Sequence, residues 1–461
     1  VSSTNVAIGN SAGQTTQGAD AVAVGSGAGL TTQGASAVAI GADAGTTSQG
    51  TNAVAIGNDA GKTSQSVIAV AVGAQAGGTS QGNSAVAIGY RAGKTTQGAS
   101  AVAIGTSAGK TTQGIQSVAI GENAGNSNQG IAALAIGNLA GFDNQGQSAI
   151  AIGENAGVQV QGASAVAIGY NAGNVEQSIE CIAIGKDAGS GASVTATYVS
   201  GGVASTVMVV DDTTNIVVGM RVTSTGTGFT YTLLEQQQTV LSIDNATTVT
   251  LSAVANAGTP SGTISFKSAQ EFYSIAIGSS AGLTSQTAGA VALGYHAGMT
   301  AQMGAVAVGS RAGEVTQGNG GVAVGVDAGR TNQGLHGIAI GKFAGNSNQS
   351  QKGIAIGYQT GETSQGEYSI AIGERAGETN QHANSIILNA SDSPLNSVQT
   401  DQFIVKPVRN DTMTTILGYD AGTGEVTHNA AIPGYTNTAD LKALVAASTD
   451  FADYQTRIAA L

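Results

Sequence analysis

A short apolar run that ends in glycine recurs along this chain at a step of sixteen residues. The run occurs twelve times in succession and, after an interruption, seven times more, with a single step of fifteen. The closing glycines are Gly9, Gly25, Gly41, Gly57, Gly73, Gly89, Gly105, Gly121, Gly137, Gly153, Gly169, Gly185, Gly278, Gly294, Gly309, Gly325, Gly341, Gly357 and Gly373. In a twentieth run Asn389 replaces the glycine, as expected of a capping unit. Such a period predicts a repeat architecture.

Each unit has the pattern of one coil of a β-solenoid. In "VAIG" the larger apolar residues stand two apart around an alanine, which is strand periodicity with valine and isoleucine on one face. A second glycine follows four residues later, as at Gly13 and Gly29, and such paired glycines indicate tight corners. The sequence "TTQG" then predicts a second short strand. We expect an all-β fold, a repetitive parallel β-solenoid or β-roll of sixteen-residue coils.

A glutamine recurs in the second strand at eighteen positions, from Gln17 to Gln381. We favour an inward ladder, in which each amide stacks on its copy one coil away and satisfies buried polar groups. A row of ligand-binding glutamines is the alternative. The residues that represent the ladder are Gln17, Gln33, Gln49, Gln97, Gln113, Gln286, Gln333 and Gln381.

One coil is too small to be stable by itself. Burying a valine and an isoleucine contributes roughly 3 to 6 kcal/mol, whereas ordering sixteen residues of backbone costs roughly 16 to 32 kcal/mol. Side chains for a thick core are missing, because glycine accounts for 70 of the 461 residues and aromatic residues for 4%. We therefore expect other chains to supply the burial, and a homotrimer is the simplest closed assembly that forms a rod.

The interruption predicts a separate small domain. Gly185 and Gly278 are 93 residues apart where sixteen are due, and the residues after Gly189 change to strand-like runs separated by turn residues. This pattern favours a small antiparallel β-barrel or sandwich. Phe229 and Tyr231 lie in a polar and aromatic loop and are candidate receptor contacts, with buried strand aromatics as the alternative.

The end of the chain changes character twice. A segment with strand-like runs and a glycine-rich turn predicts a β-hairpin. The last segment predicts a helix whose apolar residues follow a heptad seam, either in a trimeric coiled coil or packed on its own chain. The seam includes Leu444, Phe451, Tyr454 and Ile458. The expected division is 1–189 (repeats), 190–273 (inserted domain), 274–391 (repeats and cap), 392–436 (hairpin segment) and 437–461 (helix).

Composition argues against several functions. The net charge of −12 is unfavourable for nucleic-acid binding, and no apolar run approaches the roughly 18 residues of a membrane span. Cys181 is the only cysteine, and the four histidines are scattered without a plausible nucleophile. Glu122 and Glu154 share a repeat position two coils apart, but solvated corner charges explain them better than a glycosidase pair does. We expect no enzymatic activity, no metal and no cofactor.

Three stretches resemble known protein families. "NSAVAIGYRAG" and "GASAVAIGTSAG" are similar to the head repeats of trimeric autotransporter adhesins, which implies a left-handed parallel β-roll in a trimer. The stretch Asn215 to Phe266 resembles a module of bacteriophage tail fibres. The C-terminal segment resembles those of structural and fibre proteins from viruses of aquatic microbes.

The sequence thus predicts a non-enzymatic homotrimeric fibre, most simply a phage tail fibre on the virion surface. Its expected partners are its own copies, a host cell-surface glycan or protein, and other virion tail proteins. The alternatives are a bacterial trimeric surface adhesin, an ice-binding β-solenoid and a polysaccharide depolymerase. Two features argue against ice binding: a long glutamine on the same face as the threonine, and the drift of the threonine position to Asp143, Gln159 and Val175.

Overall fold

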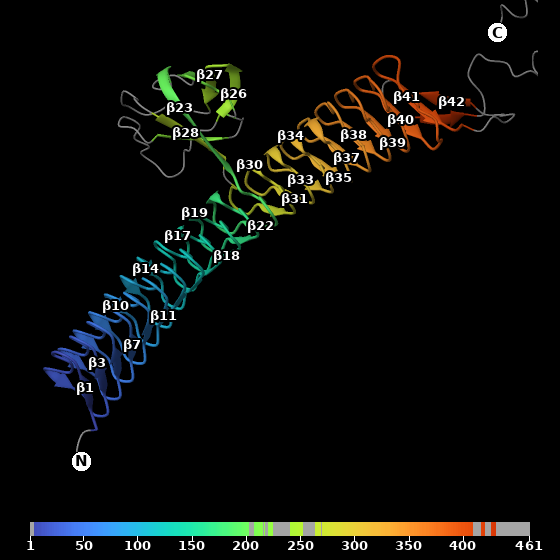
Figure 1. The fold of residues 1–461 in the computed structure, drawn as a ribbon. Helices are drawn as coiled ribbons and strands as arrows, with labels where there is room; N and C mark the ends of the chain where they lie inside the picture. Colours follow the sequence, from blue (N-terminus) through green and yellow to red (C-terminus); the bar gives the residue numbers. More distant parts are fainter. Residues whose placement is uncertain are drawn as a thin grey trace, which may run out of the picture. The chain divides into compact units, whose positions relative to one another are not determined.

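The computed structural model describes residues 4–201, 207–214, 216, 220–224, 240–251, 263–268, 270–408, 416–419 and 426–429. Within these residues the chain is all-β, with a parallel solenoid of about sixteen residues per coil and a small antiparallel sheet (Figure 1). The predicted fold class is therefore confirmed. The chain divides into one unit that ends at Lys406 and a second that begins at Pro407.

The first strand of every coil joins one long parallel sheet of 21 strands. Identical positions of neighbouring coils stand opposite one another, as in the pair Ala23 and Ala39. The strands are β1 (Val6–Ile8), β3 (Val22–Val24), β5 (Val38–Ile40), β7 (Val54–Ile56), β9 (Val70–Val72), β11 (Val86–Ile88), β13 (Val102–Ile104), β15 (Val118–Ile120), β16 (Leu134–Ile136), β18 (Ile150–Ile152), β20 (Val166–Ile168), β22 (Ile182–Ile184), β29 (Ile275–Ile277), β31 (Val291–Leu293), β33 (Val306–Val308), β35 (Val322–Val324), β37 (Ile338–Ile340), β38 (Ile354–Ile356), β39 (Ile370–Ile372), β40 (Ile386–Asn389) and β41 (Phe403–Lys406). Their pairing follows chain order, so each coil stacks on the one before it.

The glutamine-bearing strands form shorter parallel sheets on the other side of the coils. The first contains β2 (Thr16–Gln17), β4 (Thr32–Gln33), β6 (Ser48–Gln49), β8 (Ser64–Gln65), β10 (Ser80–Gln81), β12 (Thr96–Gln97) and β14 (Thr112–Gln113). The second contains β17 (Asp143–Gln145), β19 (Gln159–Gln161) and β21 (Val175–Gln177), and the third β30 (Thr284–Gln286), β32 (Thr300–Gln302), β34 (Val315–Gln317) and β36 (Thr331–Gln333). Isolated bridges such as Gln113 to Gln129 continue the stack where no strand is assigned.

Alanine lines the interior of the solenoid. From β3 to β39 the central alanine of the first strand has no exposed surface, and the alanine before the second corner glycine is buried in the same way, as at Ala39 and Ala44. Gln33 reaches across from the second strand to within 2.8 Å of the carbonyl oxygen of Val22. Because one glutamine side chain spans the distance between the two sheets, only a methyl group fits beside it. The valines and isoleucines therefore lie on the outer surface.

The first corner glycine is required by its backbone conformation and by close packing. Gly41 has φ +127°, and a Cβ there would lie 2.6 Å from the carbonyl oxygen of Gly57 in the next coil. The residue two positions later is left-handed, as at Asp43 with φ 55°. The first position of this corner therefore favours glycine strongly, because a side chain would be strained at this φ and would clash with the next coil.

The second strand occurs in two forms. From β2 to β14 the residue before the glutamine is Thr or Ser and lies in the strand. From β17 onwards the residue before the glutamine has a left-handed backbone, as at Asn144 with φ 55°. The residues on either side of this position pair with the next strand. Asparagine tolerates the left-handed region, whereas β-branched threonine disfavours it. Asn144, Asn332 and Asn380 suit this conformation. Val160 and Thr316 adopt it with φ 47° and 55°, although both are β-branched.

The inserted domain has a six-stranded antiparallel sheet in the order β25, β28, β23, β24, β27, β26. Its strands are β23 (Ala192–Gly201), β24 (Val207–Val210), β25 (Arg221–Ser224), β26 (Val240–Asn245), β27 (Thr248–Leu251) and β28 (Thr263–Ser268). Met208, Val249 and Leu251 belong to its separate apolar core. The coil resumes at Gln270, before the predicted boundary at residue 273, because this glutamine takes its place in the ladder.

The solenoid extends beyond the predicted capping unit. Strand β40 pairs in parallel with β41, so the latter belongs to the long sheet and not to the predicted hairpin segment. Ile387 replaces the interior alanine and packs with Leu395 and Ile404. Strands β42 (Ile416–Tyr419) and β43 (Val426–Asn429) form an antiparallel pair of their own. The predicted helix at 437–461 lies outside the described residues.

Candidate interaction faces of the solenoid

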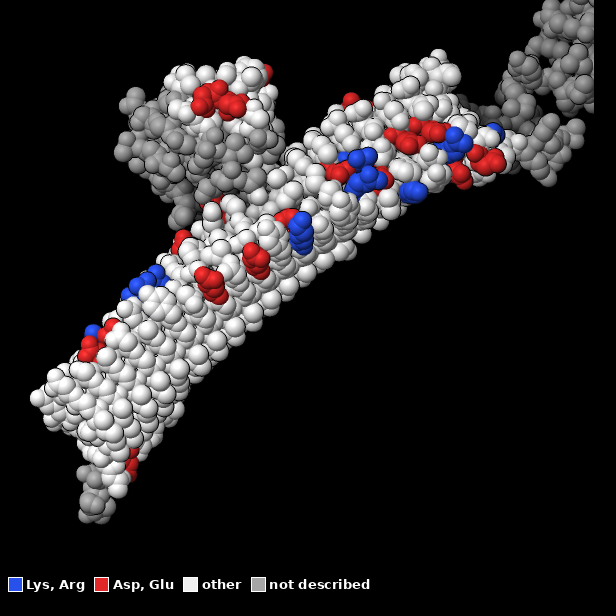
Figure 2. Space-filling model, in the orientation of Figure 1, with Lys and Arg blue, Asp and Glu red and all other residues white. Residues whose placement is uncertain are grey.

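The outer surface of the long sheet is uncharged and aliphatic. We call it the aliphatic face, and it consists of the two residues that flank the central alanine in each first strand from β1 to β39. All of these positions hold Val, Ile or Leu. Ile40 is 38% exposed and Leu293 is 43% exposed. The acidic and basic side chains gather instead in a line along the coils, beside a wide uncharged surface (Figure 2).

The second strands of the first seven coils carry a double row of hydroxyl groups, which we call the hydroxyl face. It consists of Thr15, Thr16, Thr31, Thr32, Thr47, Ser48, Thr63, Ser64, Thr79, Ser80, Thr95, Thr96, Thr111 and Thr112, all exposed. Their strands pair in register, as in the pair Thr96 and Thr112. None of these hydroxyl groups forms a hydrogen bond with another residue in the described part of the chain.

One argument made from the sequence against ice binding is wrong. The glutamine was expected to lie on the same face as the outward threonine, but Gln49 and Gln65 are each 2% exposed and point into the coil. The hydroxyl face is therefore free of long side chains at these positions. The drift to Asp143, Gln159 and Val175 still holds. The double row itself ends after the seventh coil, because Asn128 replaces the second hydroxyl residue in the eighth.

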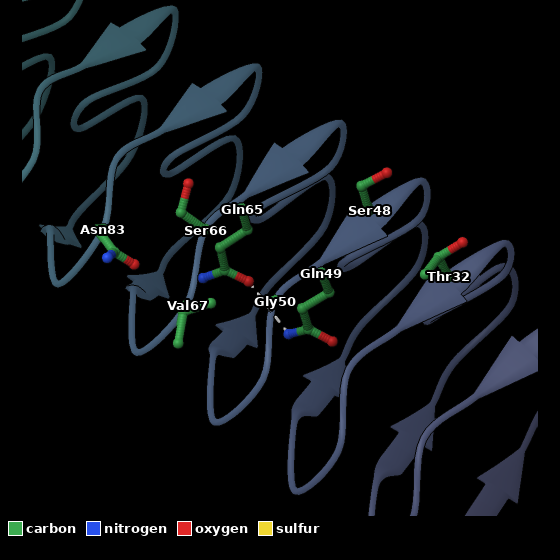
Figure 3. A pocket seen from close by; sticks show the side chains of 8 residues that line it. All are labelled: Thr32, Ser48, Gln49, Gly50, Gln65, Ser66, Val67 and Asn83. Atoms are coloured by element: carbon green, nitrogen blue, oxygen red, sulfur yellow. Dashed lines mark hydrogen bonds between the residues drawn. The ribbon is translucent and has the colours of Figure 1, made fainter.

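A shallow hollow of about 350 Å³ borders the hydroxyl face. Its lining residues are Thr32, Ser48, Gln49, Gly50, Gln65, Ser66, Val67 and Asn83. Thr32 and Ser48 lie on neighbouring coils, and the hydrogen bond between Gln49 and Gln65 joins the coil of Ser48 to the following one (Figure 3). Since no charged side chain lines the hollow, it suits water or a neutral polar ligand.

Inside the coils the glutamines form an amide ladder. Gln49 Nε2 donates to the carbonyl oxygen of Val38 at 2.8 Å and to Oε1 of Gln65 at 3.1 Å. The same pattern includes Gln33, Gln97, Gln286 and Gln333 as donors to the next glutamine, and Gln113 and Gln381 as acceptors. Gln17, at the first described coil, donates only to backbone carbonyls. The side-chain amide groups are therefore engaged in hydrogen bonds within the coils, as the structural ladder requires.

Sequence reasoning missed one member of this ladder. Gln270 accepts from Gln177 at 3.1 Å and donates to Gln286 at 3.2 Å, so the ladder crosses the inserted domain without a gap. The signal was present, because Gln270 precedes Gly278 by eight residues, as Gln17 precedes Gly25.

Two exposed aromatic residues were also missed. Phe272 is 47% exposed and Tyr273 is 61% exposed, on the turn that follows Gln270. Their ring centroids are 6.5 Å apart and tilted by 46°. Isolated aromatics have no period, so only the position of this turn in the fold distinguishes them.

A chain of ionisable groups crosses three coils near the fifteen-residue step. Glu314 accepts a hydrogen bond from Arg330 Nε at 2.6 Å and lies 3.3 Å from Nδ1 of His296. Asp327, 1% exposed, accepts from Arg311 at 2.8 Å. Burial raises the pKa of the Glu314 carboxyl, but the hydrogen bonds and charges of Arg330 and His296 outweigh it and hold that pKa below its ordinary value. The cluster is neutralised internally.

The remaining candidates show no catalytic arrangement. Glu122 and Glu154 are exposed at the corners of separate coils. Cys181 is buried, its Sγ donates to the carbonyl oxygen of Glu271 at 2.8 Å, and burial raises the pKa of its thiol. Among the residues that the structure describes, no group of His, Cys, Asp and Glu is arranged to hold a metal ion. Phe229 and Tyr231 lie outside the described residues, as does the seam of Leu444, Phe451, Tyr454 and Ile458.

Comparison with known proteins adds no relative. No protein-family model, no curated protein and no solved structure matches this chain. In the described ranges no helix has the length and apolar character needed to cross a membrane. The aliphatic face and the hydroxyl face are therefore the features that bear on function.

Proposed function

We propose that the chain is a non-enzymatic structural and adhesive fibre of a virus, most simply a phage tail fibre, in which three copies pack through the aliphatic face. The observation that carries this proposal is the face itself: two aliphatic side chains per coil, without a charge, over nineteen coils. Exposed apolar surfaces of this extent mark sites of association.

Burial of this face provides enough free energy to hold an assembly together. Fully burying a Val or Ile side chain contributes about 1.5 to 3 kcal/mol, and each coil offers two that are already partly covered. Association costs an estimated 4 to 15 kcal/mol, so a minority of the coils offsets it. A rotation axis parallel to the solenoid sets every coil against its own copies, and therefore keeps the contact uniform along the chain.

The proposed roles of the remaining segments follow from this assembly. The solenoid holds the inserted domain and the C-terminal residues away from the particle, where they contact a host surface glycan or protein. The resemblance of the insertion to tail-fibre modules supports a viral origin. Phe229 and Tyr231 remain predicted receptor contacts, and the helical seam remains a predicted trimer contact.

Solution mass tests the assembly. Light scattering of the purified chain is expected to give about three times the 44.9 kDa of one copy. Ile104→Lys places a charge on the aliphatic face, whereas Glu122→Lys places one at an exposed corner. Because nineteen coils share the contact, we expect both variants to assemble at high concentration, and only the first to dissociate on dilution at a higher protein concentration than the parent. A parent chain that stays a monomer contradicts the proposal.

The viral assignment is tested separately. Antibodies raised against the purified chain are expected to label virus particles in electron micrographs. Labelling of intact bacterial cells instead would favour the surface adhesin. Release of oligosaccharides from host polysaccharide by the purified chain would favour the depolymerase.

Ice binding is a second candidate, favoured by the hydroxyl face. Its rows are in register, and their axial repeat of about 4.8 Å is near that of water oxygens on a prism face of ice. A thermal-hysteresis assay with Thr63→Tyr tests it, because tyrosine interrupts the double row. Thr363→Tyr is the matched control, since Thr363 is exposed at the same place in a coil without the double row. Absence of hysteresis in the parent removes this candidate.

A further inference from the structure

We propose that Phe272 and Tyr273, with the open turn at Gly289 in the next coil, form a binding platform for a neutral pyranose sugar of a surface glycan. The inference rests on the proposed adhesive function and deepens it by naming a site and a ligand class. The platform lies on the turns that lead from the glutamine strand back to the aliphatic strand.

The two rings are exposed to solvent. Aromatic residues are only 4% of this chain, and an aromatic side chain contributes most when it is buried. Phe272 and Tyr273 nevertheless leave about half or more of their surfaces in solvent, at 47% and 61%. Tilted rings 6.5 Å apart present a broad apolar surface with one hydroxyl group at its rim. The apolar face of a pyranose ring fits such a surface.

Open space lies beside the rings on the side of the next coil. The next coil has Gly289 at the position of Tyr273. A Cβ added at Gly289 would meet nothing within 4 Å. The backbone does not require glycine there, because Asn52 adopts the same left-handed turn with φ 58°. The absence of side chains therefore leaves Tyr273 uncovered on this side.

Tyr368 lies in the same turn of a later coil, and a lysine contacts the face of its ring. Tyr368 occupies the position of Tyr273 in a later coil and is 50% exposed. Lys352, one coil earlier, places its ammonium group 4.6 Å from the centre of that ring. The ring of Tyr368 is therefore occupied by the chain itself, whereas no such cation is recorded over Tyr273 among the described residues.

The polar groups around the platform select a neutral ligand. Glu180 is exposed at the position of Tyr273 one coil earlier. Glu271 is held beside the next turn, because its carboxylate accepts a hydrogen bond from the amide of Ala288 at 3.1 Å. Carboxylates accept hydrogen bonds from sugar hydroxyl groups but repel sialic acid, uronic acids and sulfated sugars. The ligand class that fits is therefore an uncharged hexopyranose.

The test is a glycan array that contains neutral, sialylated and sulfated oligosaccharides, probed with the full-length chain and two variants. Tyr273→Ala removes the ring, and Gly289→Asn fills the space with a residue that the same turn accepts at Asn52. Both are expected to weaken binding to neutral glycans about tenfold or more. Tyr368→Ala is the matched control and is expected to bind as the parent does. Circular dichroism and light scattering on each variant verify the fold and the mass.

Three outcomes overturn the inference, and a fourth supports it while removing the fibre. A trimeric parent that binds no neutral glycan removes the platform and leaves the fibre proposal standing. Unchanged binding by Tyr273→Ala and Gly289→Asn places the sugar site elsewhere, and a preference for acidic glycans contradicts the ligand class. A monomeric parent that binds neutral glycans through Tyr273 supports the platform and removes the trimeric fibre.

Discussion

At the scale of single residues, the glutamines stabilise the interior because each buried amide bonds to backbone carbonyl groups of the facing sheet, and most amides also bond to the next glutamine. Gln145 donates to Leu134 and Gln161, and accepts from Gln129. The amide thereby links the two sheets of its own coil and two neighbouring coils. An apolar side chain of similar size fills the same volume but makes none of these bonds.

We predict that Gln145→Leu destabilises its coil by about 3 kcal/mol or more. The substitution leaves the amide hydrogen of Gln129 and the Oε1 of Gln161 buried without partners, and each such group costs about 1 to 3 kcal/mol. Hydrogen exchange measured by mass spectrometry should show faster exchange in residues 127–161. Gln17→Leu is the control, with a smaller effect because Gln17 is partly exposed. Equal effects at the two sites would contradict the ladder's contribution.

The corner glycines give a second prediction at this scale. Gly105→Ala places a Cβ 2.6 Å from the carbonyl oxygen of Gly121, at φ +127°. We expect a loss of about 3 kcal/mol or more, since neither the backbone nor the neighbouring coil can yield. Gly78→Ala is the control, because its φ is not left-handed and its nearest atom is 3.2 Å away. Thermal unfolding followed by circular dichroism compares the two variants.

At the scale of elements, the second form of the glutamine strand places one residue per coil in the left-handed region. Val160 has φ 47° and is 47% exposed, so it suffers backbone strain and gains little from burial. We predict that Val160→Asn stabilises the coil by about 1 kcal/mol. Thr96→Asn, in the extended form, should give no gain. A lower unfolding temperature for Val160→Asn than for the parent would refute the strain argument.

The ionic cluster gives a pH prediction for the coils from Gly294 to Arg330. The pKa of Glu314 is lowered in the folded chain, so its contribution to stability is full above the unfolded pKa of about 4.3 and is lost as the pH falls through the folded value. Hydrogen exchange of these coils, corrected for intrinsic rates, should be constant from neutral pH to about pH 5 and accelerate below about pH 4. Glu314→Gln is expected to flatten this profile. An unchanged profile would assign the acid sensitivity to other carboxylates.

At the scale of the whole molecule, the solenoid is continuous and the inserted domain is an addition to it. Ile182 pairs with Ile275 across the insertion, and the amide ladder runs from Gln177 through Gln270 to Gln286. We predict that replacing residues 190–269 with Asn-Val-Glu, the residues at the equivalent place in the preceding coil, keeps the solenoid folded. The thermal midpoint should change by a few degrees at most, as measured by circular dichroism. Loss of cooperative unfolding would show that the insertion is needed for the fold.

The sequence by itself determined the coil and its period. A step of sixteen residues, strand periodicity in "VAIG" and paired glycines are local patterns, and they predicted the strands, the corners and the place of the interruption. The inward direction of the glutamine was also accessible, because a recurring polar residue needs a recurring partner. The candidate sugar site could not be predicted from the sequence. Phe272 and Tyr273 do not recur with the repeat, and the open space at Gly289 is evident only when the neighbouring coils are stacked.

Only the tertiary structure decided which side of each strand faces inward. Alternation in a strand separates two faces but does not say which is buried, and the larger valine and isoleucine are the usual choice. Here Ala39 lies inside and Ile40 outside, because the two sheets are one glutamine side chain apart. The separation of the sheets is a property of the folded coil, set by contacts between residues eleven apart, and a local sequence pattern does not contain it.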